Sequence, residues 1–172
     1  MTVRSTTYEY EQSSESGRER HIRVPYARLK DVTPALHDPF AITARTAGME
    51  VCGTVITLNA TTSEIIGNVA EGAVYVHNVR NVLTYDGANN EATWGVTNVG
   101  DPVYYDVTAD ANTAGICKLS TSPLQGDAAT ANPRFGTIIM EQTEDADDFS
   151  KGSAIAGDSD RYAVLQCGLN ES

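Results

Sequence analysis

Short runs of β-branched and aromatic residues, separated by clusters of glycine, proline, aspartate and asparagine, recur along this 172-residue chain. No segment repeats its apolar residues at the period of an amphipathic helix, which is about 3.6 residues. Brief apolar runs between turn-forming clusters are typical of all-β domains. We therefore predict an all-β fold, a small β-barrel or sandwich of about seven short strands, with an extended N-terminal arm.

Strands are predicted where β-branched and aromatic residues alternate with polar ones. Gly53 lies inside one of these runs, where it indicates a bulge or the close approach of another backbone. Residues 61–66 fit a brief helical turn or a loop. The predicted strands of the β domain cover residues 49–58, 73–85, 93–99, 103–105, 135–140 and 162–167.

Residues 1–40 differ in composition from residues 41–172, and we divide the chain there into an arm with a linker and a β domain. Residues 1–20 are rich in Ser, Thr, Glu and Arg and contain almost no aliphatic side chains, so we expect them to be flexible on their own. Residues 31–40 include two prolines, each of which disfavours helix in the residue before it. We interpret this last segment as a linker.

The segment between them, residues 18–30, mixes basic with apolar side chains. The alternation of Ile22, Val24 and Tyr26 predicts an extended strand. Pro25 keeps that strand at the edge of a sheet or outside any ladder. A basic and apolar strand outside the main domain is typical of a docking arm, and a solvated leader without a partner is the alternative. The predicted partner-binding residues are Arg18, Arg20, Arg23, Tyr26, Arg28 and Lys30.

The net charge of −11 is distributed unevenly along the chain. Residues 1–45 hold 7 of the 12 basic side chains and 6 acidic ones, so the rest of the chain carries the whole negative excess. An acidic body repels phosphate, which argues against nucleic acid as a partner. The N-terminus lacks the apolar core of a secretion signal, and no run approaches the roughly 20 apolar residues of a membrane span. We expect a soluble protein, made in the cytosol, with no membrane partner.

Three cysteines, Cys52, Cys117 and Cys167, form no CxxC pair and lie among apolar neighbours. Free cysteine in such surroundings behaves as a small hydrophobic residue. We therefore predict buried, reduced thiols that bind no metal.

Residues 106–112 place oxygen-bearing side chains at alternate positions, as a calcium-binding loop does. Ala111 stands where such a loop needs glycine, and Cys117 stands where it needs glutamate, so an Asx-rich turn is the better interpretation. Solvated loops also account better than a cation site for the acidic side chains near the C-terminus. These are Asp145, Asp147, Asp148, Asp158 and Asp160.

The sequence contains no nucleophile elbow, no phosphate-binding glycine loop and no His-Glu-x-x-His motif. Of the three histidines, His21 and His37 fall in the arm and the linker, and His77 alternates with valines in a predicted strand, where a structural imidazole is expected. We predict that the protein is not an enzyme, with no catalytic residue, no metal ligand and no cofactor.

The order of motifs in the second half resembles the cement, or head decoration, proteins of tailed bacteriophages. It runs from Gly100-Asp101-Pro102-Val103-Tyr104-Tyr105-Asp106 through a polar loop to Phe135-Gly-Thr-Ile-Ile-Met140, then through an acidic loop to a last strand. The resemblance covers residues 41–169. It implies a structural protein on the capsid exterior, synthesised in the host cytoplasm, that bridges subunits of the major capsid protein, commonly as a homotrimer. We expect removal of residues 1–30 to leave a folded domain that no longer binds capsids tightly.

Two other functions stay open at this point. A virion adhesin for host glycans would use the aromatic faces of Trp94, Tyr104 and Tyr105, unless these rings alternate into the core and its rim. A hydrolase would pair carboxylates of the acidic loops, such as Asp147 and Asp158.

Overall fold

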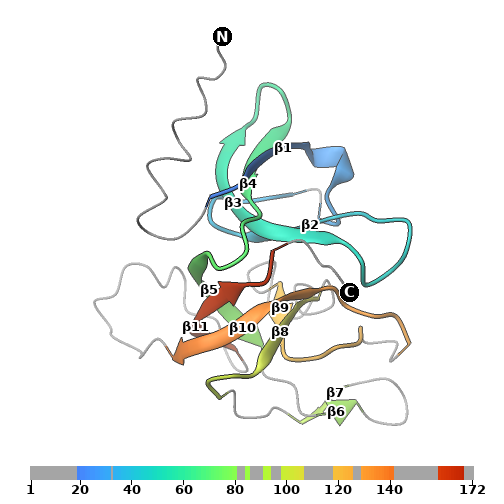
Figure 1. Cartoon of the computed structure of the whole chain (residues 1–172). Helices are drawn as coiled ribbons and strands as arrows, with labels where there is room; N and C mark the ends of the chain where they lie inside the picture. Colours follow the sequence, from blue (N-terminus) through green and yellow to red (C-terminus); the bar gives the residue numbers. More distant parts are fainter. Residues whose placement is uncertain are drawn as a thin grey trace.

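Two β units, a four-stranded sheet and a closed five-stranded barrel, lie one above the other (Figure 1). In the part of the chain that the structure describes, all of the regular structure apart from one short 3-10 turn is strand, which confirms the predicted all-β fold and its barrel alternative. The computed structural model describes residues 19–31, 33–80, 84–85, 91–93, 98–106, 118–125, 129–141 and 159–168.

The four-stranded sheet is antiparallel throughout, and its strand order is β1-β4-β3-β2. Its strands are β1 (His21–Pro25), β2 (Pro39–Ile42), β3 (Val51–Asn59) and β4 (Glu64–Asn68). The 3-10 turn η3 (Tyr26–Arg28) follows β1 directly. An isolated bridge between Leu29 and Ile42 then brings the chain after η3 to the opposite edge strand.

The barrel closes in the order β10-β11-β5-β9-β8, with β8 paired back to β10. All of its pairs are antiparallel except the short parallel pair of β5 with β9. Its strands are β5 (Val74–Arg80), β8 (Pro102–Tyr105), β9 (Leu119–Ser120), β10 (Arg134–Glu141) and β11 (Ser159–Gln166). A separate two-stranded sheet joins β6 (Thr84–Tyr85) to β7 (Glu91–Thr93).

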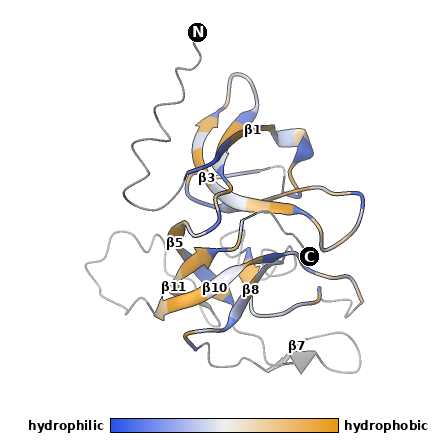
Figure 2. Cartoon of the chain, viewed as in Figure 1, coloured by the Kyte–Doolittle hydropathy of each residue, from blue (hydrophilic) through white to orange (hydrophobic). Residues whose placement is uncertain are grey.

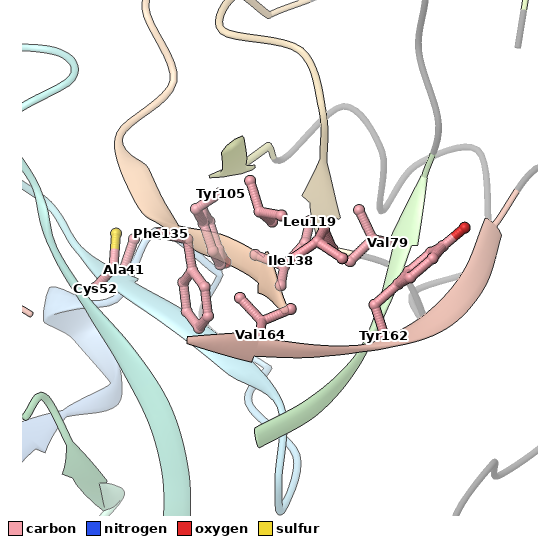
Figure 3. Close-up of a cluster of buried hydrophobic side chains, with 10 residues drawn as sticks. Ala41, Cys52, Val79, Tyr105, Leu119, Phe135, Ile138, Tyr162 and Val164 are labelled. Carbon is pink, nitrogen blue, oxygen red and sulfur yellow. The ribbon is translucent and has the colours of Figure 1, made fainter. Parts of the chain in front are cut away.

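Each unit has its own apolar core. Figure 2 shows hydrophobic stretches in the strands of both units. One core lies on the sheet face that turns away from the barrel, and it contains Val24, Leu29, Phe40, Val55, Ile65 and Val69. The other core fills the barrel, and it also takes in Ala41 and Cys52 from the sheet, which lie beside Phe135 (Figure 3). The sheet therefore caps the barrel, and the side chains that it buries in the barrel core join the two units.

Glycine allows this sheet to pack closely. A Cβ added to Gly53 would lie 2.9 Å from Cε1 of Phe40 and would overlap the carbonyl oxygen of Asn68, so the predicted close approach is present. A Cβ added to Gly67 would overlap the Phe40 ring in the same way. The bulge of β3 lies elsewhere, between Val55 and Thr57.

The structure corrects the predicted division between an arm and a domain. Residues 21–40, assigned to the arm and the linker, supply β1 and the first two residues of β2, so a boundary after residue 40 would cut through β2. Val24 on β1 is only 4% exposed, so this segment is part of a core and is not an appendage. Composition missed this because a short edge strand adds few apolar residues to a polar segment.

Several predicted elements also differ in extent. The predicted helical turn at residues 61–66 is instead the end of a hairpin turn followed by β4, because Glu64–Asn68 pairs with strands on both sides. Of the predicted strand at residues 73–85, residues 74–80 form β5 and residues 84–85 form β6, and residues 81–83 lie outside the described residues. Of the predicted strand at residues 93–99, Thr93 ends β7, Val99 lies in a turn, and residues 94–97 lie outside the described residues. The described residues thus form eleven strands, where about seven were predicted.

Candidate interaction surface and buried charge sites

Three of the six predicted partner-binding side chains lie exposed along β1 and η3. Arg20 precedes β1, Arg23 lies within it and Arg28 ends η3. We call Arg20, Arg23 and Arg28 the β1 surface. Among the described residues, none of the three forms an ion pair. Arg18 lies outside the described residues.

The other two predicted side chains turn towards the protein. Tyr26 packs against the core that contains Val24 and Leu29. Lys30 forms an ion pair with Glu50, at 2.6 Å between Nζ and Oε1, and the Glu50 side chain is only 2% exposed. In this structure Lys30 is therefore paired inside the protein with a buried carboxylate, unlike the three arginines of the β1 surface.

The position of β1 explains which of its side chains face outward. The strand pairs with β4 on one side and is the edge of the sheet on the other, as Pro25 predicted. Ile22 and Val24 point into the core, so Arg23 between them points to the opposite face. Its neighbours across the sheet are Ile66 on β4 and Thr57 on β3, beyond the part of this face that the barrel covers.

A buried hydrogen-bond network joins the sheet to the barrel. The Thr54 hydroxyl on β3 donates to Oε1 of Gln166 on β11 at 2.7 Å and lies 3.1 Å from Nε2 of His77 on β5. Gln166 in turn donates to the carbonyl oxygens of Asn68 and Ala70. Since the single hydroxyl proton of Thr54 goes to Gln166, Nε2 of His77 must be the donor in the other contact.

His77 accordingly has the structural role predicted for it. The ring is 3% exposed and meets Phe135 edge to face, with centroids 5.3 Å apart. Its position in the network fixes the tautomer that carries the proton on Nε2.

A second polar site joins the two units through Lys118, the residue before β9. Its Nζ contacts Oδ2 of Asp31 and lies 3.0 Å from Oδ2 of Asp38, and its side chain is only 3% exposed. Both aspartates belong to the segment between η3 and β2. Burial lowers the pKa of Lys118, but the hydrogen bonds and charges of the two aspartates outweigh it and leave the pKa raised.

The two carboxylates differ in their surroundings. Burial acts to raise the pKa of Asp31, yet hydrogen bonds from Lys118 and Thr33 prevail and leave it lowered. Thr33 supplies two of these bonds, both to Oδ1, from its backbone N–H at 2.9 Å and its hydroxyl at 2.7 Å. At Asp38 burial prevails over Lys118, so its pKa is raised.

The local fold explains how residues 31 and 38 reach Lys118. The backbone N–H of Lys30 donates to the Ala41 carbonyl at 2.8 Å, before the loop. After the loop, the N–H of Val55 donates to the Asp38 carbonyl, also at 2.8 Å. The loop is thus fixed to the sheet at both ends, and it presents both carboxylates towards the barrel.

The group formed by Lys118, Asp31 and Asp38 was not predicted from the sequence. Its members are separated by up to 87 positions, and carboxylates and amines so distant in sequence converge only through the fold. One signal was present, because Lys118 is among the few basic residues in the acidic part of the chain.

Of the two described thiols, Cys52 is buried as predicted, whereas Cys167 is only half-buried. Cys52 is free and buried, and burial raises its pKa well above the usual 9.0, with the nearby Cys167 adding to the effect. Cys167 is free and half-buried, and its Sγ lies 3.4 Å from the Arg134 carbonyl oxygen. Cys117 lies outside the described residues.

The aromatic residues considered for glycan binding separate into core and rim. Tyr105 is 1% exposed and belongs to the barrel core, so it cannot offer a face to a sugar. Tyr104 is partly exposed, and the Arg134 guanidinium lies 6.0 Å from its ring centroid. Trp94 lies outside the described residues.

The acidic loops are mostly outside the described part of the chain. This holds for Asp145, Asp147, Asp148 and Asp158, and Asp160 is described only as part of β11. Within the described ranges, no group of three or more histidine, cysteine, aspartate or glutamate side chains is arranged to hold a metal ion. The described residues also include no helix with the length and apolar character needed to span a membrane.

Comparison with known proteins gave no relative. A scan against protein-family models, a search of curated proteins and a search of solved structures each found no match to this chain.

Proposed function

We propose that this protein is a structural protein of a virion, a cement protein that binds the outer surface of a tailed-phage capsid through its β1 surface. The observation that carries the proposal is the set of three exposed arginines along an edge strand of a protein with a net charge of −11. Exposed arginines without internal ion pairs are available to carboxylates of a partner, and arginine is enriched at protein interfaces.

The two-unit fold suits such a role. The sheet that carries the β1 surface is joined to the barrel by buried apolar and polar contacts, so force applied at the β1 surface is transmitted to the whole protein. A standard interface buries about 1,600 Å² in total, and several copies that each bridge neighbouring coat subunits add their contacts together. We propose a homotrimer, on the resemblance described above, with the major capsid protein as partner.

Charge reversal tests this proposal. The variant Arg23→Glu with Arg28→Glu should bind undecorated shells of the virus that encodes the chain at least tenfold more weakly in a co-sedimentation assay, because two contacts with carboxylates become repulsive. Point variants are preferable to removal of residues 1–30, which would delete β1 and expose a core.

The control introduces two glutamates at another place on the surface. Thr61 and Thr62 are exposed at the turn between β3 and β4, and changing both to glutamate adds negative charge without touching the β1 surface. This control should bind like the unmodified protein. Equal binding by the arginine variant and the unmodified protein would refute the β1 surface as the capsid contact, and a monomeric mass in solution would refute the trimer.

A further inference from the structure

The buried charge site between the two units has the composition of a bond-forming site. It contains one buried amine, Lys118, whose side chain is 3% exposed, and two partly exposed carboxylates, Asp31 at 18% and Asp38 at 23%. The nitrogen contacts Oδ2 of Asp31, so the amine and the carboxyl group are already held together, as a reaction that depends on proximity requires. We propose that Lys118 and Asp31 join in an intramolecular isopeptide bond, and that Asp38 relays the protons.

The contacts at Asp31 assign separate roles to its two oxygens. Oδ1 accepts hydrogen bonds from the N–H and the hydroxyl of Thr33, so negative charge that develops on Oδ1 would meet two donors already in place. Oδ2 contacts the amine and is the oxygen that leaves. This arrangement matches the needs of a tetrahedral intermediate at a carboxyl carbon.

The reaction balances without any further reagent. Asp38 takes a proton from the Lys118 ammonium and passes it to Oδ2 of Asp31, which makes that carboxyl group neutral. The neutral nitrogen then forms a bond to Cγ of Asp31, while one electron pair moves to Oδ1. The pair then returns from Oδ1, the bond from Cγ to Oδ2 breaks, and Oδ2 departs as water. Both protons of that water come from Nζ through Asp38, which ends as it began.

The surroundings of Asp38 suit it for this relay. Its Oδ2 lies 3.0 Å from Nζ, within reach of direct proton transfer. Burial raises its pKa despite the charge of Lys118, and a carboxylate with a raised pKa accepts a proton more readily than an ordinary aspartate.

A second ion pair in the same protein, Lys30 with Glu50, lacks two features of the Lys118 site. Lys30 lies 2.6 Å from Glu50, but among the described residues only this one carboxylate forms an ion pair with the amine, and none of them donates a hydrogen bond to Oε2 of Glu50. That pair lacks both the proton relay and the donors for an oxyanion. It should remain an ion pair and serve as the internal control.

The bond would fasten the loop between η3 and β2 to the barrel. Residues 31 and 118 would become the ends of a closed loop that contains every strand from β2 to β8. Such a covalent bond reduces the conformational entropy of the unfolded chain as a disulfide does, but a reductant cannot break it.

The test is the intact mass of the purified full-length protein by electrospray ionisation. We expect the unmodified sequence to be lighter than calculated by the mass of one water molecule. We also expect a tryptic digest to contain residues 31–45 linked to residues 81–134, because trypsin does not cleave after an acylated lysine. A mass equal to the calculated one, in folded protein, would overturn the proposal and leave an ion pair only.

Single substitutions identify the residues from which the water molecule is lost. Lys118→Arg, Asp31→Ala and Asp38→Asn should each restore the calculated mass, whereas Lys30→Arg should still show the loss. Circular dichroism should confirm that each variant is folded, and Asp38→Asn is the closest in shape. If the loss persists in Lys118→Arg, it arises elsewhere, for instance from a succinimide at Asp86-Gly87, and the proposal is refuted.

Discussion

Replacing Thr54 with valine tests whether the buried hydrogen-bond network holds the sheet on the barrel. Thr54 is fully buried, and its hydroxyl serves both Gln166, at 2.7 Å, and His77, at 3.1 Å. Valine keeps the shape but leaves the Gln166 oxygen without this donor and His77 Nε2 without this acceptor. A buried polar group left unsatisfied costs about 1–3 kcal/mol, so the two together should lower the free energy of unfolding by about 2–4 kcal/mol.

The measurement is urea-induced unfolding, followed by fluorescence and far-UV circular dichroism. The matched control is Thr57→Val, the same change on the same strand at an exposed position, which should alter stability by less than about 0.5 kcal/mol. A double-mutant cycle with Gln166→Leu should show that the two losses are not additive, by about 0.5–3 kcal/mol. If Thr54→Val and Thr57→Val were equally stable, the network would not be what joins the units.

Two further predictions concern the core. Gly67→Ala should destabilise the protein by about 1–3 kcal/mol in the same urea assay, because the new methyl group overlaps the Phe40 ring, and the additional change Phe40→Leu should recover part of the loss. An equal loss in the double variant would contradict this contact. Burial raises the pKa of Cys52 well above 9.0, so the folded state favours the protonated thiol. The contribution of Cys52 to stability should therefore be constant below pH 9.0, and stability should fall as the pH rises further. Cys52→Ala should weaken that fall, and an unchanged pH profile would show that Cys52 does not cause it.

The strand predicted most accurately from the sequence is one whose apolar residues are also the residues that pack in the core. The run that became β10 was placed to within one residue at each end, because it is almost continuously apolar or β-branched and its side chains Phe135 and Ile138 are buried in the barrel. β4 was missed, since Thr61 and Thr62 suggest a helix cap, yet pairing with β1 and β3 decides the conformation of Glu64–Asn68. Local propensity is a weak guide wherever pairing with distant strands supplies most of the stability.

The candidate surface was predicted in part. Arg20, Arg23 and Arg28 are exposed as a docking surface requires, but Lys30 is not, because the strand that follows brings Glu50 to it. A sequence shows that a basic residue is present, and the partner in space determines whether its charge is used inside the protein or outside.

The sequence by itself determined that this chain is all-β, that an edge strand lies near its N-terminus and that Cys52 is buried, since these follow from residue types and their alternation. Only the tertiary structure decided that residues 21–42 belong to a sheet that caps the barrel, and that Lys118 meets Asp31 and Asp38. The physical reason is that alternation is a local property, whereas the pairing of strands and of buried charges joins residues far apart in the chain, which contact one another only after folding.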